Sequence, residues 1–392
     1  MIPINEPRKS PPIAIFNLGF RPFFLLGALS APFLIGYWLM LYSQGGSVGY
    51  YGNSLYWHAH EMLLGFTLAI IAGFLLTAVR NWTSVQTPYG LPLAVLTLLW
   101  ILARVLPFVP DLSPWVIALV DLAFAPSVAL AIGLPILRAR NYRNLLFVPI
   151  LLAFFAANLL VHLEVLQVTT ATALTGLHLA LYLAITVITV IGGRVIPFFT
   201  ERGVSGVTCH RYSWVEKIII PATLIWLVTT LINPEFVAPA ASATMAILTL
   251  VRCYGWFDTR IVQVPLVWIL QVGYLFIPLG FILTALASLG MISSSVALHS
   301  FAVGGIGLLT LGMMARVSLG HTGRPLQVTP MITAAFVLMT LSALIRVSIS
   351  YLPLPYLAGL HLSGTLWAIA WLLFLIRYVP ILLRPRVDGL FG

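Results

Sequence analysis

The sequence predicts an all-α polytopic membrane protein, with about twelve transmembrane helices in one bundle and both termini in the cytoplasm. Of its 392 residues, 60% are hydrophobic and only 8% are charged, whereas soluble domains are about 45–50% apolar and about 25% charged. Twelve spans of about 20 apolar residues each would use about as many apolar residues as the chain contains. A soluble domain of this length would lack the polar surface it needs. The composition also excludes a disordered chain and a disulfide-stapled secreted domain.

Twelve apolar runs, bounded by polar residues or by proline and glycine, predict the individual helices. They lie near residues 22–42, 58–79, 91–109, 114–137, 145–167, 171–193, 215–232, 236–254, 262–289, 293–315, 329–350 and 356–379. The connections are too short to form a separate domain. We therefore expect a single membrane domain, with a cytoplasmic segment over 1–21, the helix bundle over 22–379 and a cytoplasmic tail over 380–392.

The distribution of lysine and arginine predicts the orientation of the helices. All of the 20 basic residues except Arg104 and Arg346 lie at the two ends of the chain or near every second connection. The intervening connections, near 43–57, 110–113, 168–170, 233–235, 290–292 and 351–355, contain none. Because positively charged connections stay in the cytoplasm, we expect both termini there and an even number of spans. The net charge of +10 is then a consequence of topology and does not indicate a nucleic-acid partner.

Three charged residues are predicted inside the membrane, in its outer half. Arg104 and Arg346 lie late in spans that run outward, and Asp121 lies early in a span that runs inward. Intramembrane charges are costly, and they mark either a functional site or a structural ion pair. Arg104 and Asp121 could pair between neighbouring helices. We expect Arg104 or Arg346 to meet a buried anion, either Asp121 or the propionate of a haem.

Six of the eight histidines are predicted at one depth, close to the outer boundary of the membrane. They are His58, His60, His162, His178, His299 and His361. The 16 residues from His178 to Arg194, at the inner end of the same span, correspond to about 24 Å at about 1.5 Å per residue, in a hydrocarbon core of about 30 Å. Neutral imidazole is the usual protein ligand of haem iron, copper and zinc, so this set predicts a metal site.

The neighbours of these histidines bear on how such a site would be built. Six imidazoles would suffice for a bis-histidine haem and a neighbouring copper, although packing histidines are the alternative. His58 and His60 are two residues apart, about 200° around a helix, so both could face one site only where the helix is irregular. Glu61 or Glu164 could orient an imidazole through its second nitrogen. The two cysteines are predicted on the opposite side and form no CxxC motif, so a thiolate ligand is not expected.

A second group of polar residues is predicted at the inner ends of the sixth and tenth spans. Each end contains glycine or proline, in GGRVIPFFTER at 192–202 and in MMARVSLGHTGRP at 313–325. These residues permit broken helix ends, which are tolerated at membrane depth only inside protein or around a cavity. The basic residues concerned are Arg194, Arg316, His321 and Arg324. They could form an anion-binding pocket, although ordinary cytoplasmic charges beside turn residues would give the same pattern.

Five distinctive motifs extend from near the N-terminus into the final third of the chain. They are FNLGFRPFF at 16–24, WHAHEM at 57–62, AGFLLTAV at 72–79 before NWT at 81–83, GGRVIPFFT at 192–200 and SLGHTGRP at 318–325. In combination they resemble the NnrS proteins, a family of bacterial membrane proteins associated with nitric oxide metabolism. The resemblance implies a polytopic protein of the bacterial inner membrane that contains haem of the b type and copper. It also implies a role in protection from nitrosative stress, but no particular reaction.

The resemblance also implies which residues belong to the family's sites. Those inside matching motifs are His58, His60, Glu61, Arg194, His321 and Arg324. His162 and His299 are similar in position to family residues, whereas His178 and His361 match no motif and are included for their depth alone. Arg80 stands where an apolar residue or proline is expected, a departure that leaves the histidines untouched.

Three functions are compatible with these features. We expect a haem and copper protein that binds or processes nitric oxide or its iron-nitrosyl products, because a metal centre can bind a small neutral gas from the bilayer without a substrate cleft. The main alternative is a secondary transporter of a proton-coupled solute or a metal ion, since twelve spans with both termini inside is a common transporter layout. The third is a haem oxidoreductase with quinol as its electron donor. The chain contains no glycine-rich nucleotide-binding motif.

The orientation can be tested by cysteine labelling. In a chain without its two natural cysteines, Ser47→Cys in the 43–57 connection should react with a membrane-impermeant maleimide added outside intact cells. Ser205→Cys, in a connection predicted to be cytoplasmic, should react only after the membrane is opened. Labelling of Ser47→Cys from the cytoplasmic side alone would refute the orientation.

Overall fold

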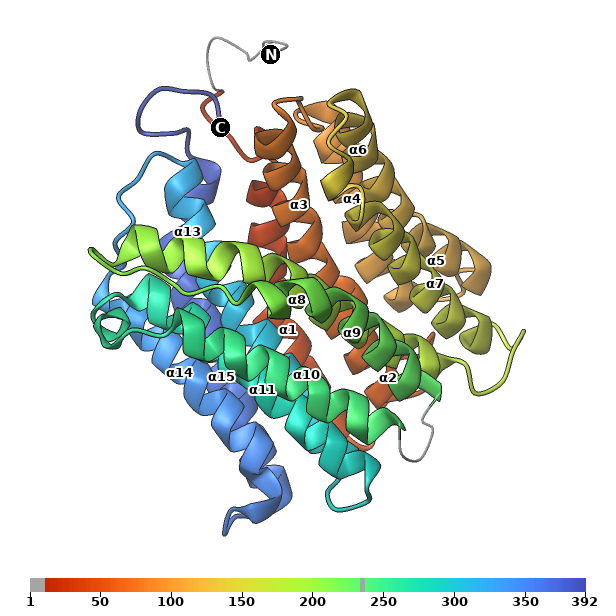
Figure 1. Cartoon of the computed structure of the whole chain (residues 1–392). Coiled ribbons are helices and arrows are strands. Elements are labelled where there is room, and N and C mark those ends of the chain that lie inside the picture. Colours follow the sequence, from red (N-terminus) through yellow and green to blue (C-terminus); the bar gives the residue numbers. More distant parts are fainter. Residues whose placement is uncertain (1–10, 233–236) are drawn as a thin grey trace. The chain divides into compact units, whose positions relative to one another are not determined.

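The computed structural model describes residues 11–232 and 237–392, which form helices joined by turns and loops and contain no strand (Figure 1). Within these residues, twelve helical segments are long and apolar enough to cross a membrane. The predicted all-α polytopic fold with twelve spans is therefore confirmed. Arg8, Lys9 and the connection at 233–235 lie outside the described residues.

The spans follow the predicted order, and several consist of two or three consecutive helices. The first six are α1 (Phe20–Gln44), α2 (Ser54–His60) with η1 (Glu61–Thr67) and α3 (Leu68–Thr83), α4 (Leu91–Val105) with η2 (Leu106–Phe108), α5 (Pro114–Leu122) with α6 (Phe124–Arg138), η3 (Tyr142–Asn144) with α7 (Phe147–Val165), and α8 (Ala173–Gly203). The last six are α9 (Ser213–Ile232), α10 (Val237–Trp256), α11 (Pro265–Ser288), α12 (Ser294–His299) with η5 (Ser300–Gly307) and α13 (Leu308–His321), α14 (Pro330–Ser348) with η6 (Ile349–Tyr351), and α15 (Tyr356–Leu383). The short helix η4 (Thr259–Gln263) precedes α11.

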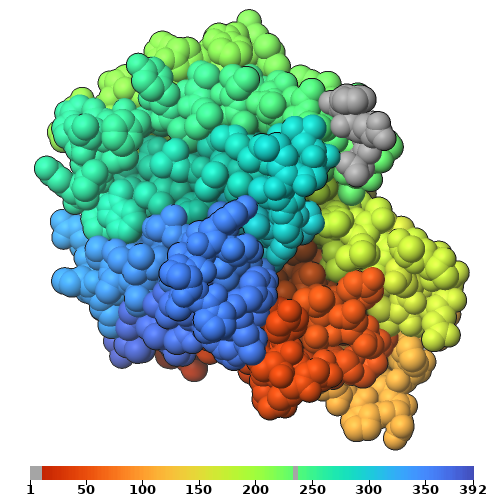
Figure 2. Space-filling view, turned by 90° about the horizontal axis from the view of Figure 1, so that it is seen from below, coloured from red at the N-terminus to blue at the C-terminus, as the bar shows by residue number. Residues whose placement is uncertain are grey.

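The chain divides into two compact units. The first extends to Ala180 and includes Val317–Pro325 and Leu375–Gly392, and the second comprises Leu181–Arg316 and Leu326–Phe374. In Figure 2 the residues of the second unit appear in green, teal and blue. Because α8, α13 and α15 each cross a boundary between these ranges, the backbone of three helices contributes to both units.

Both units carry large apolar side chains on their outer surfaces. In the first unit Leu119 and Leu130 are exposed, and in the second Ile225, Ile247 and Leu344 are exposed. A soluble protein rarely leaves extended apolar surface uncovered. On helices of these lengths, such residues form the surface that contacts the lipid bilayer.

In the first unit, the FNLGFRPFF motif joins the first helix to the end of the last. The guanidinium of Arg21 is fully buried and donates hydrogen bonds to the backbone carbonyls of Ile381, Leu382 and Arg384 at distances of 3.2, 2.6 and 2.9 Å. The last carbonyls of a helix have no partner within the helix. Arg21 therefore supplies the donors that the C-terminal end of α15 lacks.

The structure differs from the expected broken end of the sixth span. Helix α8 continues through Gly192, Gly193 and Pro197 to Gly203. A Cβ atom at Gly192 would lie 2.9 Å from the ring of Tyr274, and one at Gly193 would lie 2.6 Å from the guanidinium of Arg252. The two glycines thus permit close helix packing in the second unit, and they do not break the helix.

Candidate metal centre

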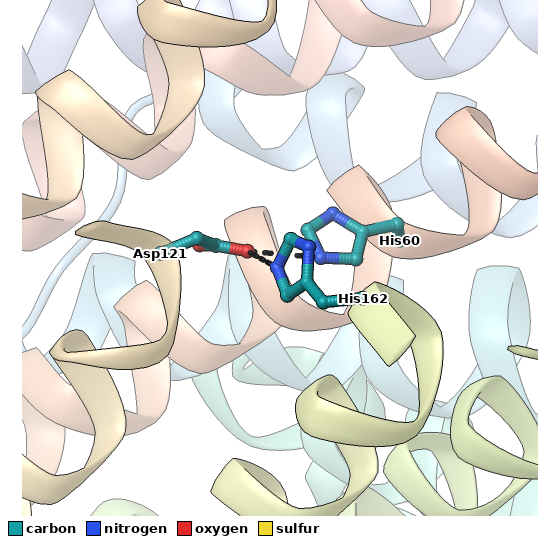
Figure 3. A group of neighbouring side chains, drawn as sticks. All are labelled: His60, Asp121 and His162. Carbon is teal, nitrogen blue, oxygen red and sulfur yellow. Dashed lines mark hydrogen bonds and ion pairs between the residues drawn. The ribbon is translucent and has the colours of Figure 1, made fainter. Parts of the chain in front are cut away.

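Three residues predicted from the sequence meet in the first unit. His60, at the end of α2, Asp121, in α5, and His162, near the end of α7, each present one ligand atom, and these atoms lie within 4.8 Å of one another (Figure 3). The exposed fractions of the three residues are 0%, 4% and 0%. Each of the three spans therefore contributes one buried donor to a common point.

The carboxylate of Asp121 occupies the middle of this group. Its Oδ2 atom lies 3.0 Å from Nε2 of His60 and 2.9 Å from Nε2 of His162, and it accepts a hydrogen bond of 3.0 Å from Nδ2 of Asn158. Its Oδ1 atom is ion-paired with Nη2 of Arg104. The pairing of Arg104 with Asp121 that the sequence suggested is present.

His60 has partners on both ring nitrogens. Its Nδ1 atom lies 3.1 Å from Oε1 of Glu61 and 3.0 Å from the hydroxyl oxygen of Tyr51, and its Nε2 atom also lies 2.9 Å from Oδ1 of Asn158. Nη1 of Arg104 donates to both oxygens of Glu61 at 3.1 Å. Glu61 therefore contacts the histidine that precedes it and also the arginine that pairs with Asp121.

Tyr50 and Tyr51 close the group from the connection between the first two spans. The hydroxyl of Tyr50 lies 2.7 Å from Nδ1 of His162. Burial, together with nearby carboxylates, raises the pKa of both tyrosines above the usual value, so both hydroxyls stay protonated at neutral pH. A neutral His162 that donates from Nε2 to Asp121 accepts at Nδ1 from Tyr50.

The backbone is irregular directly after His60. A π-helical segment, η1, begins at Glu61, and its i→i+5 hydrogen bonding is frequent at functional sites. Gly65 lies within this segment, and a Cβ atom there would be 2.7 Å from Nη1 of Arg104 and 3.0 Å from Oε2 of Glu61. The carbonyl of Gly65 accepts a hydrogen bond of 3.1 Å from Nε1 of Trp100. The absence of a side chain at Gly65 therefore gives Arg104 room to reach both carboxylates.

The charges of the group favour a bound cation. The two carboxylates of Glu61 and Asp121 face the single guanidinium of Arg104, so with neutral imidazoles the group has one excess negative charge. Uncompensated charge is strongly disfavoured in a buried site. Two imidazole nitrogens and a carboxylate oxygen suit copper, zinc and non-haem iron. The group can therefore hold one metal ion, or a proton on His60 in its place.

The same geometry does not suit a haem between these two histidines. Their ring centroids are 5.6 Å apart with an interplanar angle of 70°. Oδ2 of Asp121 lies about as close to each Nε2 atom as a hydrogen bond allows, where a shared iron would have to be. A porphyrin would have to displace Asp121 and the residues bound to it, so the group suits a single ion.

The other histidines predicted at this depth have different surroundings. The ring of His58 stacks on Trp38, with centroids 4.1 Å apart. His178, on α8, is half-buried, and His361, on α15, is exposed. His299, in the second unit, has Nδ1 at 2.7 Å from the carbonyl oxygen of Ser295 and Nε2 at 3.1 Å from Nη2 of Arg346 (contacts within that unit). Of the six histidines, the structure brings His60 and His162 together.

The remaining predicted residues are placed as follows. Oε2 of Glu164 accepts a hydrogen bond of 2.6 Å from the backbone N–H of Ala173, at the start of α8. At the inner ends, Arg194 and Arg316 belong to the second unit, whereas His321 and Arg324 belong to the first. His321 packs against Phe20, and its carbonyl accepts a hydrogen bond of 3.1 Å from Arg386.

Four residues of the group were not singled out as site residues from the sequence. Asn158 had a usable signal, because it precedes His162 by one helical turn and so shares its face. Tyr50 and Tyr51 lie in a connection, where no periodicity indicates the direction of a side chain. Gly65 is recognisable only once Arg104 is known to lie against it.

The role of Gly65 can be tested by adding one methyl group. Gly65→Ala should displace Arg104, destabilise the protein by about 1–3 kcal/mol, as overpacking does, and lower its metal content. The measurements are thermal unfolding in detergent and elemental analysis. Gly36→Ala is the control, because a Cβ atom at Gly36, in α1, meets nothing within 4 Å. Equal behaviour of the two variants would show that Gly65 does not position Arg104.

No curated protein matches this chain. A family model described as NnrS protein matches residues 14–386, which include the described parts of all twelve spans and every residue of the group around Asp121. The chain therefore belongs to the NnrS family, which is associated with the response to nitric oxide.

Proposed function

We propose that this protein binds nitric oxide at a copper ion held by His60, His162 and Asp121. The observation that supports the proposal is the buried group of two imidazoles and a carboxylate with one excess negative charge. Copper is the metal that the family resemblance implies and that imidazole ligands suit. When bound, copper would supply a position at which a small diatomic ligand can coordinate.

The residues around the three ligands would orient the imidazoles. If Nε2 of each histidine bound the metal, the proton would reside on Nδ1. Nδ1 of His60 would then donate to Glu61, as metal-bound histidines commonly do to a carboxylate. Nδ1 of His162 would donate to the hydroxyl of Tyr50, which can accept as well as donate. Arg104 would hold Glu61 and Asp121 in place and offset part of their charge.

Burial of the site suits a gaseous ligand. The ligands are inaccessible to bulk water, and nitric oxide, a small neutral molecule, can reach a buried site through the bilayer. Low exposure also strengthens the electrostatic contacts among Arg104, Glu61 and Asp121. No large substrate opening is required for this function.

We propose a separate place for haem, since His60 and His162 enclose Asp121. In the second unit, Nδ1 of His299 lies within hydrogen-bonding distance of the carbonyl of Ser295. Donation to that carbonyl leaves the acceptor electron pair on Nε2, which accepts a hydrogen bond from Nη2 of Arg346, so haem iron could bind His299 only if that guanidinium moved away. His299 is thus a neutral imidazole of the kind that ligates haem iron. We place the protein in the bacterial inner membrane with both termini in the cytoplasm.

The metal proposal is tested on the full-length protein purified in detergent. His60→Ala and His162→Ala should lose most of their copper, because each removes a ligand. His361→Ala is the control, since His361 is exposed, and it should retain the wild-type content. Copper is measured by elemental analysis, and nitric oxide binding by electron paramagnetic resonance and visible difference spectra. A colourless, metal-free wild-type protein would contradict the proposal and favour a transporter.

The orienting role of Glu61 gives a second prediction. Glu61→Gln should keep the three ligands but weaken copper binding about 10–100-fold, the usual effect of removing a partner of a metal-bound histidine. Glu164→Gln is the matched control, because Glu164 is two residues from His162 but bonds to the start of α8. Copper affinity is measured by competition with a chelator. Unchanged affinity in Glu61→Gln would exclude the orienting role.

A further inference from the structure

The second unit contains a buried charged residue, Arg316, whose surroundings differ from those of the charged group around Asp121. Arg316 lies in α13 and is only 5% exposed. Its guanidinium carbon is 4.0 Å from the centroid of the Phe199 ring, so the guanidinium lies over the aromatic face. Both residues come from the inner ends of the sixth and tenth spans, which were predicted to carry an anion pocket.

Among the residues that the structure describes, Arg316 makes no hydrogen bond and no ion pair. The other three buried arginines all have such partners in their own unit. Arg21 donates to backbone carbonyls, Arg252 pairs with Glu216 at 2.6 Å, and Arg346 donates to His299 at 3.1 Å. Arg316 is therefore the exception among the buried arginines of residues 11–232 and 237–392.

The chemistry of guanidinium makes such an exception informative. The group stays charged in proteins and has five N–H donors in its plane. The cation–π contact with Phe199 stabilises the charge through one face of the guanidinium. It provides no acceptor for the N–H donors in the plane of the group. At 5% exposure the guanidinium keeps little contact with water, so part of its hydration is lost, and an acceptor from outside the chain would replace it.

We propose that Arg316 binds a monovalent planar oxyanion, in which two oxygens accept parallel hydrogen bonds from the guanidinium. Carboxylates match the fork of arginine in this way, and nitrite has the same planar arrangement of two oxygens. The charge of such an anion equals that of Arg316, whereas a dianion would leave one negative charge unpaired. A Cβ atom at Gly203 would lie 3.8 Å from Nη1 of Arg316 and 2.7 Å from Val267, and neither residue carries a charge that would oppose the anion.

Two sources could supply this chemistry, a free small anion or a carboxylate group on a larger bound molecule. The full-length protein in detergent is titrated with sodium formate and sodium nitrite, with sodium chloride as the reference at equal ionic strength. Binding is followed by calorimetry and by the midpoint of thermal unfolding. Native mass spectrometry of the untreated protein detects a larger molecule that has been retained.

The matched control is Arg202→Gln. Arg202 also lies over a phenylalanine of the same motif, 5.8 Å from the ring centroid of Phe198, but it is exposed. The wild-type protein and Arg202→Gln should bind the small anions, and Arg316→Gln should bind them at least about tenfold more weakly, as loss of a charge-assisted hydrogen bond implies. If the larger molecule is the source, wild type and Arg202→Gln should show an adduct that Arg316→Gln lacks.

The proposal is overturned if wild type shows neither anion binding nor an adduct, or if Arg316→Gln equals wild type in both. Should Arg316→Gln fail to fold, Arg316→Lys replaces it. That variant keeps the charge but not the planar fork, so the proposal requires it to bind the anion more weakly than Arg202→Gln does. Equal binding by those two variants would also overturn the proposal.

Discussion

The carboxylate of Asp121 is the constraint on which the first unit depends. An ionised carboxylate at membrane depth has no water to solvate it, so the chain must surround it with donors. Those donors are Arg104 from α4, His60 from α2, and Asn158 and His162 from α7. Four spans that are separate in sequence are thereby held at one point, and packing of apolar side chains alone would not fix their rotations so specifically.

The number of spans was predictable from the sequence because it depends on quantities that a sequence contains directly, namely the length and polarity of each run. The depth of a residue follows similarly from helical rise. Rotation about the helix axis does not, and it separates His60, which faces Asp121, from His58, which faces Trp38. These spans carry apolar residues on most of their faces, so the periodicity of apolar residues gives little indication of which face of a helix points to the site. The π-helical segment after His60 changes the direction in which the following side chains point, and no pattern in the sequence predicted this segment.

Glycine illustrates the same difference between local and tertiary causes. Gly192 and Gly193 suggested a broken helix, because glycine is a poor helix former. In the folded chain, the absence of a Cβ atom at these two positions allows Tyr274 and Arg252 to approach the helix closely. Gly65 serves Arg104 in the same manner within the first unit. Helix propensity indicates how much a glycine destabilises its own helix. The stabilising effect of these glycines comes from close packing with side chains that are distant in sequence.

The two units thus pose opposite electrostatic problems. In the first, Glu61 and Asp121 exceed Arg104 by one negative charge, and a cation would complete the group. In the second, Arg316 has one positive charge with no partner among the described residues, and an anion would complete it. Elsewhere the chain satisfies buried arginines within itself, with carbonyls for Arg21 and a carboxylate for Arg252. Where a membrane protein leaves a buried charge incomplete, the missing charge is most simply supplied by the molecule that it binds.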